Sequence, residues 1–246
     1  MGSGSTLDVG RLEVTEPLNV YVGFDEKDIQ AMDVCIKSLE AQASIPINVI
    51  PLRHWELRSK KLFWREHLVT PDGQMIDMRD GKPFSTTFSF TRFLVPALED
   101  YQPGRAVFVD PDVLWRCDIA DVIRACEGDK AVWCVKHHHE PTDSHKFNTN
   151  VVQTRYRRKN WSSLMVFNPA KCHGLTLYRV NNDPGAHLHA MLWVHEDEIG
   201  DIPEDYNWLE GHSPETLMPK VVHYTRGTPD MLPGLPYEPE WWEYAR

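Results

Sequence analysis

Short apolar runs alternate with an amphipathic stretch at the start of the chain. Residues 18–24 (LNVYVGF) and 45–52 are apolar runs of strand length, and 28–42 carries apolar residues at helical spacing. A strand, a helix and a second strand in this order predict a parallel sheet with a right-handed crossover. The opening of the chain therefore predicts an α/β fold.

Further apolar runs predict the rest of the sheet. The predicted elements are strands at 106–109, 131–136 and 163–167 and short helices within 87–98 and at 120–125. Pro96 predicts a bend in the 87–98 helix, because proline has no N–H to donate. Many Pro, Trp and Tyr residues favour loops in the last quarter, where Trp241, Trp242 and Tyr244 are expected to pack back onto the body. Together these patterns predict a mixed, mostly parallel central sheet flanked by helices, with a loop-rich C-terminal part.

Two aspartates follow the apolar run at 106–109, where a strand is predicted to end. Asp110 and Asp112 flank Pro111, and residues two apart in an extended chain point the same way. A divalent cation relieves the repulsion between two carboxylates, and oxygen ligands favour Mg²⁺ or Mn²⁺. The pair therefore suggests metal-assisted handling of a diphosphate. A solvated turn is the alternative, because Asp-x-Asp is common by chance.

A second group of candidate residues follows the first predicted strand. Gly23, Phe24 and Asp25 stand at its exit, just as Asp110 and Asp112 stand at the exit of the later strand. In open α/β sheets, ligands bind beyond the carboxyl ends of the strands. The coincidence of the two groups predicts a nucleotide site.

Length, charge and cysteine content narrow the class of protein. The 246 residues suffice for one domain, predicted at 17–246 after a flexible leader at 1–16. No apolar run approaches about 18 residues and no signal-peptide core is present, which predicts no membrane span. Five scattered cysteines without a Cys-x-x-Cys pair are typical of a cytoplasmic protein. A net charge of −10 disfavours non-specific binding to polyanions, although 155–159 (RYRRK) is a basic cluster.

Four segments, taken in order, carry a resemblance to a known family. They are NVYVGFDEKDIQAMDVCIKSL, FSFTRFLVPAL, AVFVDPDVLWRCDIADV and KVVHYTRGTP. They resemble, respectively, the nucleotide-binding strand and helix, the diphosphate-binding helix, the Asp-x-Asp strand and the late histidine loop of GT-A glycosyltransferases. The resemblance covers residues 19–229 and is to retaining enzymes of family 8, the glycogenin and galactosyltransferase type. GFDEKD, KNWSSLMVFN, LHAMLW and IPEDYNWL resemble a bacterial and phage-like subgroup of it.

The resemblance implies a metal and donor site. Asp110, Asp112 and His223 would bind Mn²⁺, or Mg²⁺ in its place. Arg92 would pair with the donor diphosphate as a catalytic residue, and Arg226 would assist it where the family usually has a lysine.

The nucleoside and sugar ends of the donor complete the implied site. Gly23, Phe24 and Asp25 would lie beside the nucleoside. Ser162 and Ser163 would bond the sugar hydroxyls, where better-known members carry Asn-(Ala/Ser)-Gly. Asp197, in the nearest acidic pair to the missing Asp-Gln-Asp segment, would be the carboxylate near the anomeric centre.

These observations predict a metal-dependent glycosyltransferase that moves a sugar from a nucleotide-diphosphate sugar to a hydroxyl of a saccharide or glycan acceptor. The first candidate for the donor is a UDP-sugar, and the anomeric configuration is expected to be retained. One alternative is the same chemistry on a modified DNA base, with RYRRK as the groove. A nucleotidyltransferase is a second alternative, although GFDEKD is a poor phosphate loop. A non-enzymatic sugar-binding module is a third.

Overall fold

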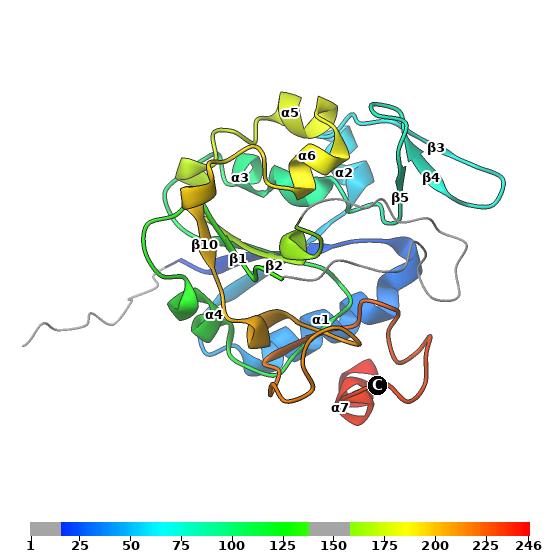
Figure 1. Ribbon diagram of the computed structural model, residues 1–246, viewed down its shortest axis with the longest axis vertical. Coiled ribbons are helices and arrows are strands. Elements are labelled where there is room, and N and C mark those ends of the chain that lie inside the picture. The colour runs from blue at the N-terminus through cyan, green and yellow to red at the C-terminus, as the bar shows by residue number, and fades with distance from the viewer. Residues whose placement is uncertain (1–15, 138–157) are drawn as a thin grey trace, which may run out of the picture.

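Six strands form the central sheet of the computed structural model, which describes residues 16–137 and 158–246 (Figure 1). In sheet order they are β10 (Ile199–Asp201), β8 (Val132–Cys134), β9 (Leu164–Phe167), β6 (Ala106–Val109), β1 (Leu18–Gly23) and β2 (Ile47–Leu52). β1 runs parallel to β2 and β6, and β8 runs parallel to β10. β9 runs antiparallel to both β6 and β8. The predicted mixed, mostly parallel sheet is confirmed.

Helices cover both faces of this sheet (Figure 1). On one face lie α1 (Ile29–Gln42) and α4 (Ile119–Ala125), and on the other lie α2 (His54–Ser59), α3 (Val95–Leu98), α5 (Leu177–Asn182) and α6 (Gly185–His189). Side chains alternate along each strand, so β6 sends Val107 and Val109 to the α1 face and Phe108 to the other. Two hydrophobic cores result, one on each face.

Two small sheets lie beside the central one. β11 (Trp208–Leu209), β12 (Val221–His223) and β7 (Val113–Trp115) form the first, and β3 (His67–Val69), β4 (Met75–Asp77) and β5 (Pro83–Phe84) form the second. In the first small sheet β12 runs antiparallel to β7. β7 directly follows the loop that leaves β6. The second stands out from the body as an arm (Figure 1).

Short helical turns connect these elements. They are the 3₁₀ turns η1 (Glu26–Asp28), η2 (Thr91–Leu94), η3 (Trp161–Ser163), η4 (Pro169–Lys171), η5 (Glu196–Glu198) and η6 (Glu204–Asn207). Within the described ranges, no helix has the length and apolar character needed to cross a membrane.

Two features of the structure correct the expectations from sequence. The helix expected within residues 87–98 is divided into the 3₁₀ turn η2 and α3, and Pro96 lies in the first turn of α3, where no N–H is required. The C-terminal part holds β11, β12 and the helix α7 (Glu238–Ala245), and is more regular than expected. Trp241 is buried and packs edge-to-face on Trp242 at 4.8 Å, which confirms that these aromatics pack onto the body.

A buried arginine ties the arm to the helices. Arg65 donates to both carboxylate oxygens of Asp77, at 3.0 and 2.5 Å, and to the carbonyls of Val180 and Asp183, at 3.0 and 2.8 Å. Its guanidinium lies 3.9 Å from the centre of the Phe90 ring. Arg65 is 2% exposed and Asp77 is 1% exposed, so both charges depend on this pairing.

Replacing Arg65 alone should therefore lower the free energy of unfolding more than replacing both Arg65 and Asp77. Arg65→Leu leaves the Asp77 carboxylate buried without its partner, and we expect a loss of about 3–5 kcal/mol in the free energy of unfolding, measured in urea. The double variant Arg65→Leu/Asp77→Leu should be more stable than Arg65→Leu. A double variant less stable than Arg65→Leu would contradict this account.

Candidate functional site

Two carboxylates and an imidazole converge where β6 ends. Asp110 and Asp112 occupy the turn between β6 and β7, and β12 pairs with β7 so that His223 lies opposite Val113. The Tyr224 N–H donates to the Asp112 carbonyl at 2.9 Å, which fixes this approach. One ligand atom from each of Asp110, Asp112 and His223 lies within 4.8 Å of the others. The structure thus brings together the three residues predicted to bind a metal.

Gly23 has a packing role at this edge of the sheet. A Cβ atom there would lie 2.8 Å from the Phe88 ring and 3.1 Å from Pro111 Cδ. The absence of a side chain lets Phe88 and Pro111 pack over the end of β1. Pro111 is the residue between the two aspartates, so Gly23 contributes to their placement.

Arg92, on η2, pairs with the first aspartate. Its Nη1 lies 2.9 Å from Asp110 Oδ1 and donates to the Ser162 carbonyl at 2.8 Å, while Nε donates to the Phe88 carbonyl at 3.3 Å. The guanidinium also lies over the rings of Phe88 and Phe108, at 5.2 and 4.9 Å. Arg92 is 5% exposed, so this cation is held in place beside the carboxylates.

Hydrogen bonds behind His223 determine which of its nitrogens faces the aspartates as an acceptor. Ser163 Oγ donates to the Asn160 carbonyl at 2.7 Å, so it accepts from Asn207 Nδ2 at 2.8 Å. That contact turns Asn207 Oδ1 toward His223 Nδ1, at 3.2 Å, and Nδ1 must therefore carry the proton. In the neutral imidazole the acceptor nitrogen is then Nε2, which lies 3.3 Å from Asp112 Oδ1.

This donor set fits a divalent cation. Two carboxylates and a neutral imidazole are ligands for Mn²⁺ or Mg²⁺, and an outer hydrogen bond to the imidazole is usual at metal sites. Nε2 and Asp112 Oδ1 are two acceptor atoms that face each other. This arrangement is favourable when a cation binds both atoms. His137 Nε2, 3.2 Å from Asn207 Nδ2, extends the network to the end of β8.

A neutral histidine supports the serines that were predicted to face the donor sugar. His189 Nδ1 lies 2.9 Å from Ser162 Oγ, and the ring also bonds the Ser89 backbone. Burial, with Arg92 and Arg65 nearby, holds the pKa of His189 well below its usual value. Ser162 and Ser163 are both buried in η3, just before β9, and the Asp110 N–H donates to the Ser163 carbonyl at 2.8 Å.

Of the residues predicted to lie beside the nucleoside, Asp25 bonds to backbone N–H groups and Phe24 packs on an aromatic ring. Asp25 accepts from the N–H groups of Lys27, at 3.1 Å, and Thr87, at 2.9 Å, so it caps η1 and holds the segment before η2. Phe24 packs edge-to-face on Trp55 at 5.0 Å. Both stand at the carboxyl end of β1, as predicted.

Two predicted residues have other partners. Arg226 is paired with the buried Glu210, whose N–H donates to the His223 carbonyl at 2.9 Å, and this carboxylate raises the pKa of Arg226. Asp197 is exposed and bonds to His195. It precedes β10, which runs parallel to β6, whereas Asp110 follows β6, so the two aspartates are at opposite edges of the sheet.

Asn207, His189 and Glu210 belong to the site but were not predicted from sequence. IPEDYNWL and LHAMLW, which carry the first two, were noticed only as marks of a subgroup. Of the basic cluster at 155–159, the first three residues lie outside the described residues. Arg158 bonds to Glu196 and to the Ala190 carbonyl.

Solved structures with the same fold are glycosyltransferases. The apo bifunctional glycosyltransferase WbbM is 14% identical with a TM-score of 0.62, covering 98% of this chain and 51% of WbbM, so the chain spans about half its length. GlyE of Streptococcus pneumoniae is 16% identical with a TM-score of 0.55, covering 93% of this chain and 60% of GlyE. The galactosyltransferase LgtC, solved with donor and acceptor sugar analogs, is 12% identical with a TM-score of 0.51, covering 93% and 95%. The fold is that of the GT-A glycosyltransferases.

At the level of sequence, Protein CDI of Arabidopsis thaliana is 40% identical over 221 residues, which are 87% of this chain and 80% of that protein. The chain therefore belongs to the family of Protein CDI. No protein-family model matches it.

Asn207→Leu should weaken metal binding at the candidate site, although Asn207 is not one of the three candidate ligands. We expect ¹⁵N NMR of the metal-free protein to show a proton on Nδ1 of His223, and we expect Asn207→Leu to lose this preference. Mn²⁺ affinity should fall about 10–100-fold, because an outer partner of a metal-binding histidine is removed.

Asn181→Leu is the matched control, since Asn181 is equally buried but bonds to Trp64 and Leu62 under the arm. It should lower stability and leave both readouts unchanged. An unprotonated Nδ1 of His223 in the wild-type protein would contradict the assignment.

His189 should make stability depend on pH. In the unfolded chain its pKa is about 6.5, and in the folded protein it is well below its usual value. Between the two values only the unfolded chain binds the proton, so stability falls as pH drops below about 6.5, by up to about 1.4 kcal/mol per pH unit. Urea unfolding from pH 7.5 to 5.5 should show a smaller loss for His189→Asn. Equal losses in the two proteins would refute this.

Proposed function

We propose that the protein is a metal-dependent glycosyltransferase that moves a sugar from a nucleotide-diphosphate sugar to an acceptor hydroxyl. The observation that carries the proposal is the convergence of Asp110, Asp112 and His223 within 4.8 Å, beside the buried Arg92. In open α/β sheets the carboxyl edge is where ligands bind, and the three residues lie there. The fold shared with glycosyltransferases supports the same chemistry.

The candidate metal centre would supply Lewis-acid stabilisation of the leaving diphosphate when Asp110, Asp112 and His223 hold a cation. Arg92 contributes a second positive charge. Among the described residues its hydrogen bonds use Nε and Nη1, which leaves Nη2 to donate to a phosphate oxygen. Because both neighbouring carbonyls hold the guanidinium, little reorganisation is needed when charge develops on the diphosphate.

The proposed donor is a UDP-sugar, with its nucleoside at the end of β1 beside Phe24 and Asp25. Ser162 and Ser163 are proposed to bind the transferred sugar, which the hydrogen bond between the Asp110 N–H and the Ser163 carbonyl supports. The proposed reaction retains the anomeric configuration, and the leaving diphosphate takes the proton of the acceptor hydroxyl. Asp197 is not assigned a role in it, because it lies at the other edge of the sheet.

The proposed acceptor is a saccharide or glycan hydroxyl. A net charge of −10 opposes the approach of a polyanion such as DNA. It places no such penalty on a neutral saccharide.

Nucleotide and metal should stabilise the protein together. In the presence of Mn²⁺, one nucleoside diphosphate should raise the melting temperature, and UDP is the first to be tested. At a nucleotide concentration of a hundred times its Kd, the free energy of unfolding should increase by about 2.7 kcal/mol. EDTA should abolish the shift, and so should Asp110→Asn, which keeps the shape of the side chain. Asp33→Asn, on the exposed side of α1, is the control and should keep the shift. The proposal fails if UDP, GDP, CDP, ADP and TDP all leave the wild-type melting temperature unchanged.

A further inference from the structure

Trp55 is an exposed aromatic residue near the carboxyl end of β1. β2 runs parallel to β1, and its last residue, Leu52, is paired with Gly23. Arg53 and Phe24 directly follow these paired ends, and Trp55 stands in the first turn of α2, two residues after Arg53. The indole is 40% exposed. The fold thus places an accessible indole next to the strand end where the nucleoside of the donor is proposed to bind.

Two neighbouring rings hold this indole. The Phe24 and Trp55 ring centres are 5.0 Å apart with an interplanar angle of 88°, and those of His54 and Trp55 are 5.2 Å apart at 81°. Nearly perpendicular packing of this kind is a favoured aromatic geometry. These contacts limit the rotation of the indole, so little side-chain entropy is lost when a ligand packs on it.

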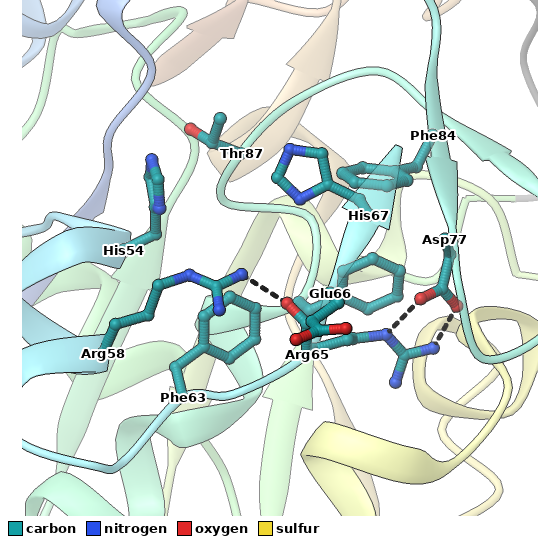
Figure 2. A pocket seen from close by; sticks show the side chains of 10 residues that line it. His54, Arg58, Phe63, Arg65, Glu66, His67, Asp77, Phe84 and Thr87 are labelled. Atoms are coloured by element: carbon teal, nitrogen blue, oxygen red, sulfur yellow. Dashed lines mark hydrogen bonds and ion pairs between the residues drawn. The ribbon is translucent and has the colours of Figure 1, made fainter. Parts of the chain in front are cut away.

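A third segment ties the start of α2 to the end of β1. Thr87 donates from its N–H to Asp25, at 2.9 Å, and from its hydroxyl to the Phe24 carbonyl, at 2.6 Å. His54 and Thr87 line the same small hollow, as Figure 2 shows. Burial and the Arg58 charge lower the pKa of His54, whereas the nearby Asp25 carboxylate opposes that shift. The end of β1, the start of α2 and the segment before η2 are therefore neighbours.

The residues that directly follow β1 offer little surface to a planar ring. Asp25 is buried, and its two carboxylate oxygens accept from the N–H groups of Lys27 and Thr87. Phe24 is buried as well. Neither side chain presents a free aromatic face at this strand end.

The other exposed aromatic side chains of the described residues lie elsewhere. Trp64 precedes β3 of the arm, and Tyr178 belongs to α5. A single exposed aromatic residue is ordinary on a protein surface. What distinguishes Trp55 is that the end of β1 holds it in place.

The order of the strands gives the indole a definite place in the proposed donor site. β9, β6, β1 and β2 are neighbours in that order, and the antiparallel β9 begins at the edge where β6 ends. The serines proposed for the sugar precede β9, the two aspartates follow β6, and Trp55 follows β2. The ends of β6 and β2 are two strand spacings apart, about 10 Å. A nucleotide-diphosphate sugar has the same order: sugar, diphosphate, ribose and base.

We propose that the indole of Trp55 stacks on the base of the nucleotide-diphosphate sugar. This role rests on the proposed function. Every base has a π face, so an aromatic side chain adds affinity for the nucleoside whichever base it carries.

The test compares UDP with inorganic pyrophosphate, which has no nucleoside, by calorimetric titration of the full chain in Mn²⁺. Trp55→Ala should weaken UDP binding at least fivefold, because one base–aromatic stack is lost. It should leave the affinities for Mn²⁺ and pyrophosphate within twofold of wild type. Trp55→Phe keeps an aromatic ring and should recover most of the UDP affinity. If another nucleoside diphosphate stabilises the protein in place of UDP, it replaces UDP in the titration.

Trp64→Ala is the matched control, because Trp64 is 39% exposed and lies before the arm. It should keep the affinity for UDP. If the wild-type protein binds none of UDP, GDP, CDP, ADP and TDP in Mn²⁺, the proposed function fails, and the role of Trp55 fails with it. If the wild-type protein binds UDP, two results refute base stacking by Trp55 and leave the proposed function standing. They are an unchanged UDP affinity in Trp55→Ala and an equal loss of UDP and Mn²⁺ affinity in that variant.

Discussion

The buried ion pair between Arg92 and Asp110 is the interaction on which the rest of the site depends. Each charge would be costly to bury alone. Arg92 also binds the carbonyls of Phe88 and Ser162, which belong to segments far apart in the sequence. One guanidinium therefore joins the segment before η2, the end of β6 and the turn that begins β9. Without it, the carboxylate of Asp110 would lack the neighbour that holds it at the carboxyl edge.

Behind this pair, the site is built from short elements that side-chain hydrogen bonds position. β12 has three residues and η6 has four, too few for local propensity to fix them. The Asn207 amide links His223 on β12 to Ser163 at the start of β9. A candidate metal ligand on a short peripheral strand thereby takes its orientation from the central sheet. The same logic applies to the arm, where the Arg65–Asp77 pair fixes a three-stranded sheet.

The parts of the fold and of the candidate site that could be predicted from the sequence are those that depend on residues close together in the chain. β1, α1 and β6 have clear periodicity, and they were predicted within two residues of their bounds. Asp110 and Asp112 were found because a buried strand ends beside them. His223 was found only through resemblance, because nothing local distinguishes it from a core histidine. Asn207 and His189 act through contacts made across the fold, and no pattern of neighbouring residues records those. Arg226 was assigned to a diphosphate, but the pairing with Glu210 depends on burial that the sequence pattern does not reveal.

The carboxyl edge of the central sheet and the arm are each held by their own buried ion pair, Arg92–Asp110 and Arg65–Asp77. The ends of β6 and β1 carry the metal and nucleoside ends of the proposed donor site, and these are formed by the central sheet. An arm anchored by one buried arginine can change its outer residues while the central sheet stays intact.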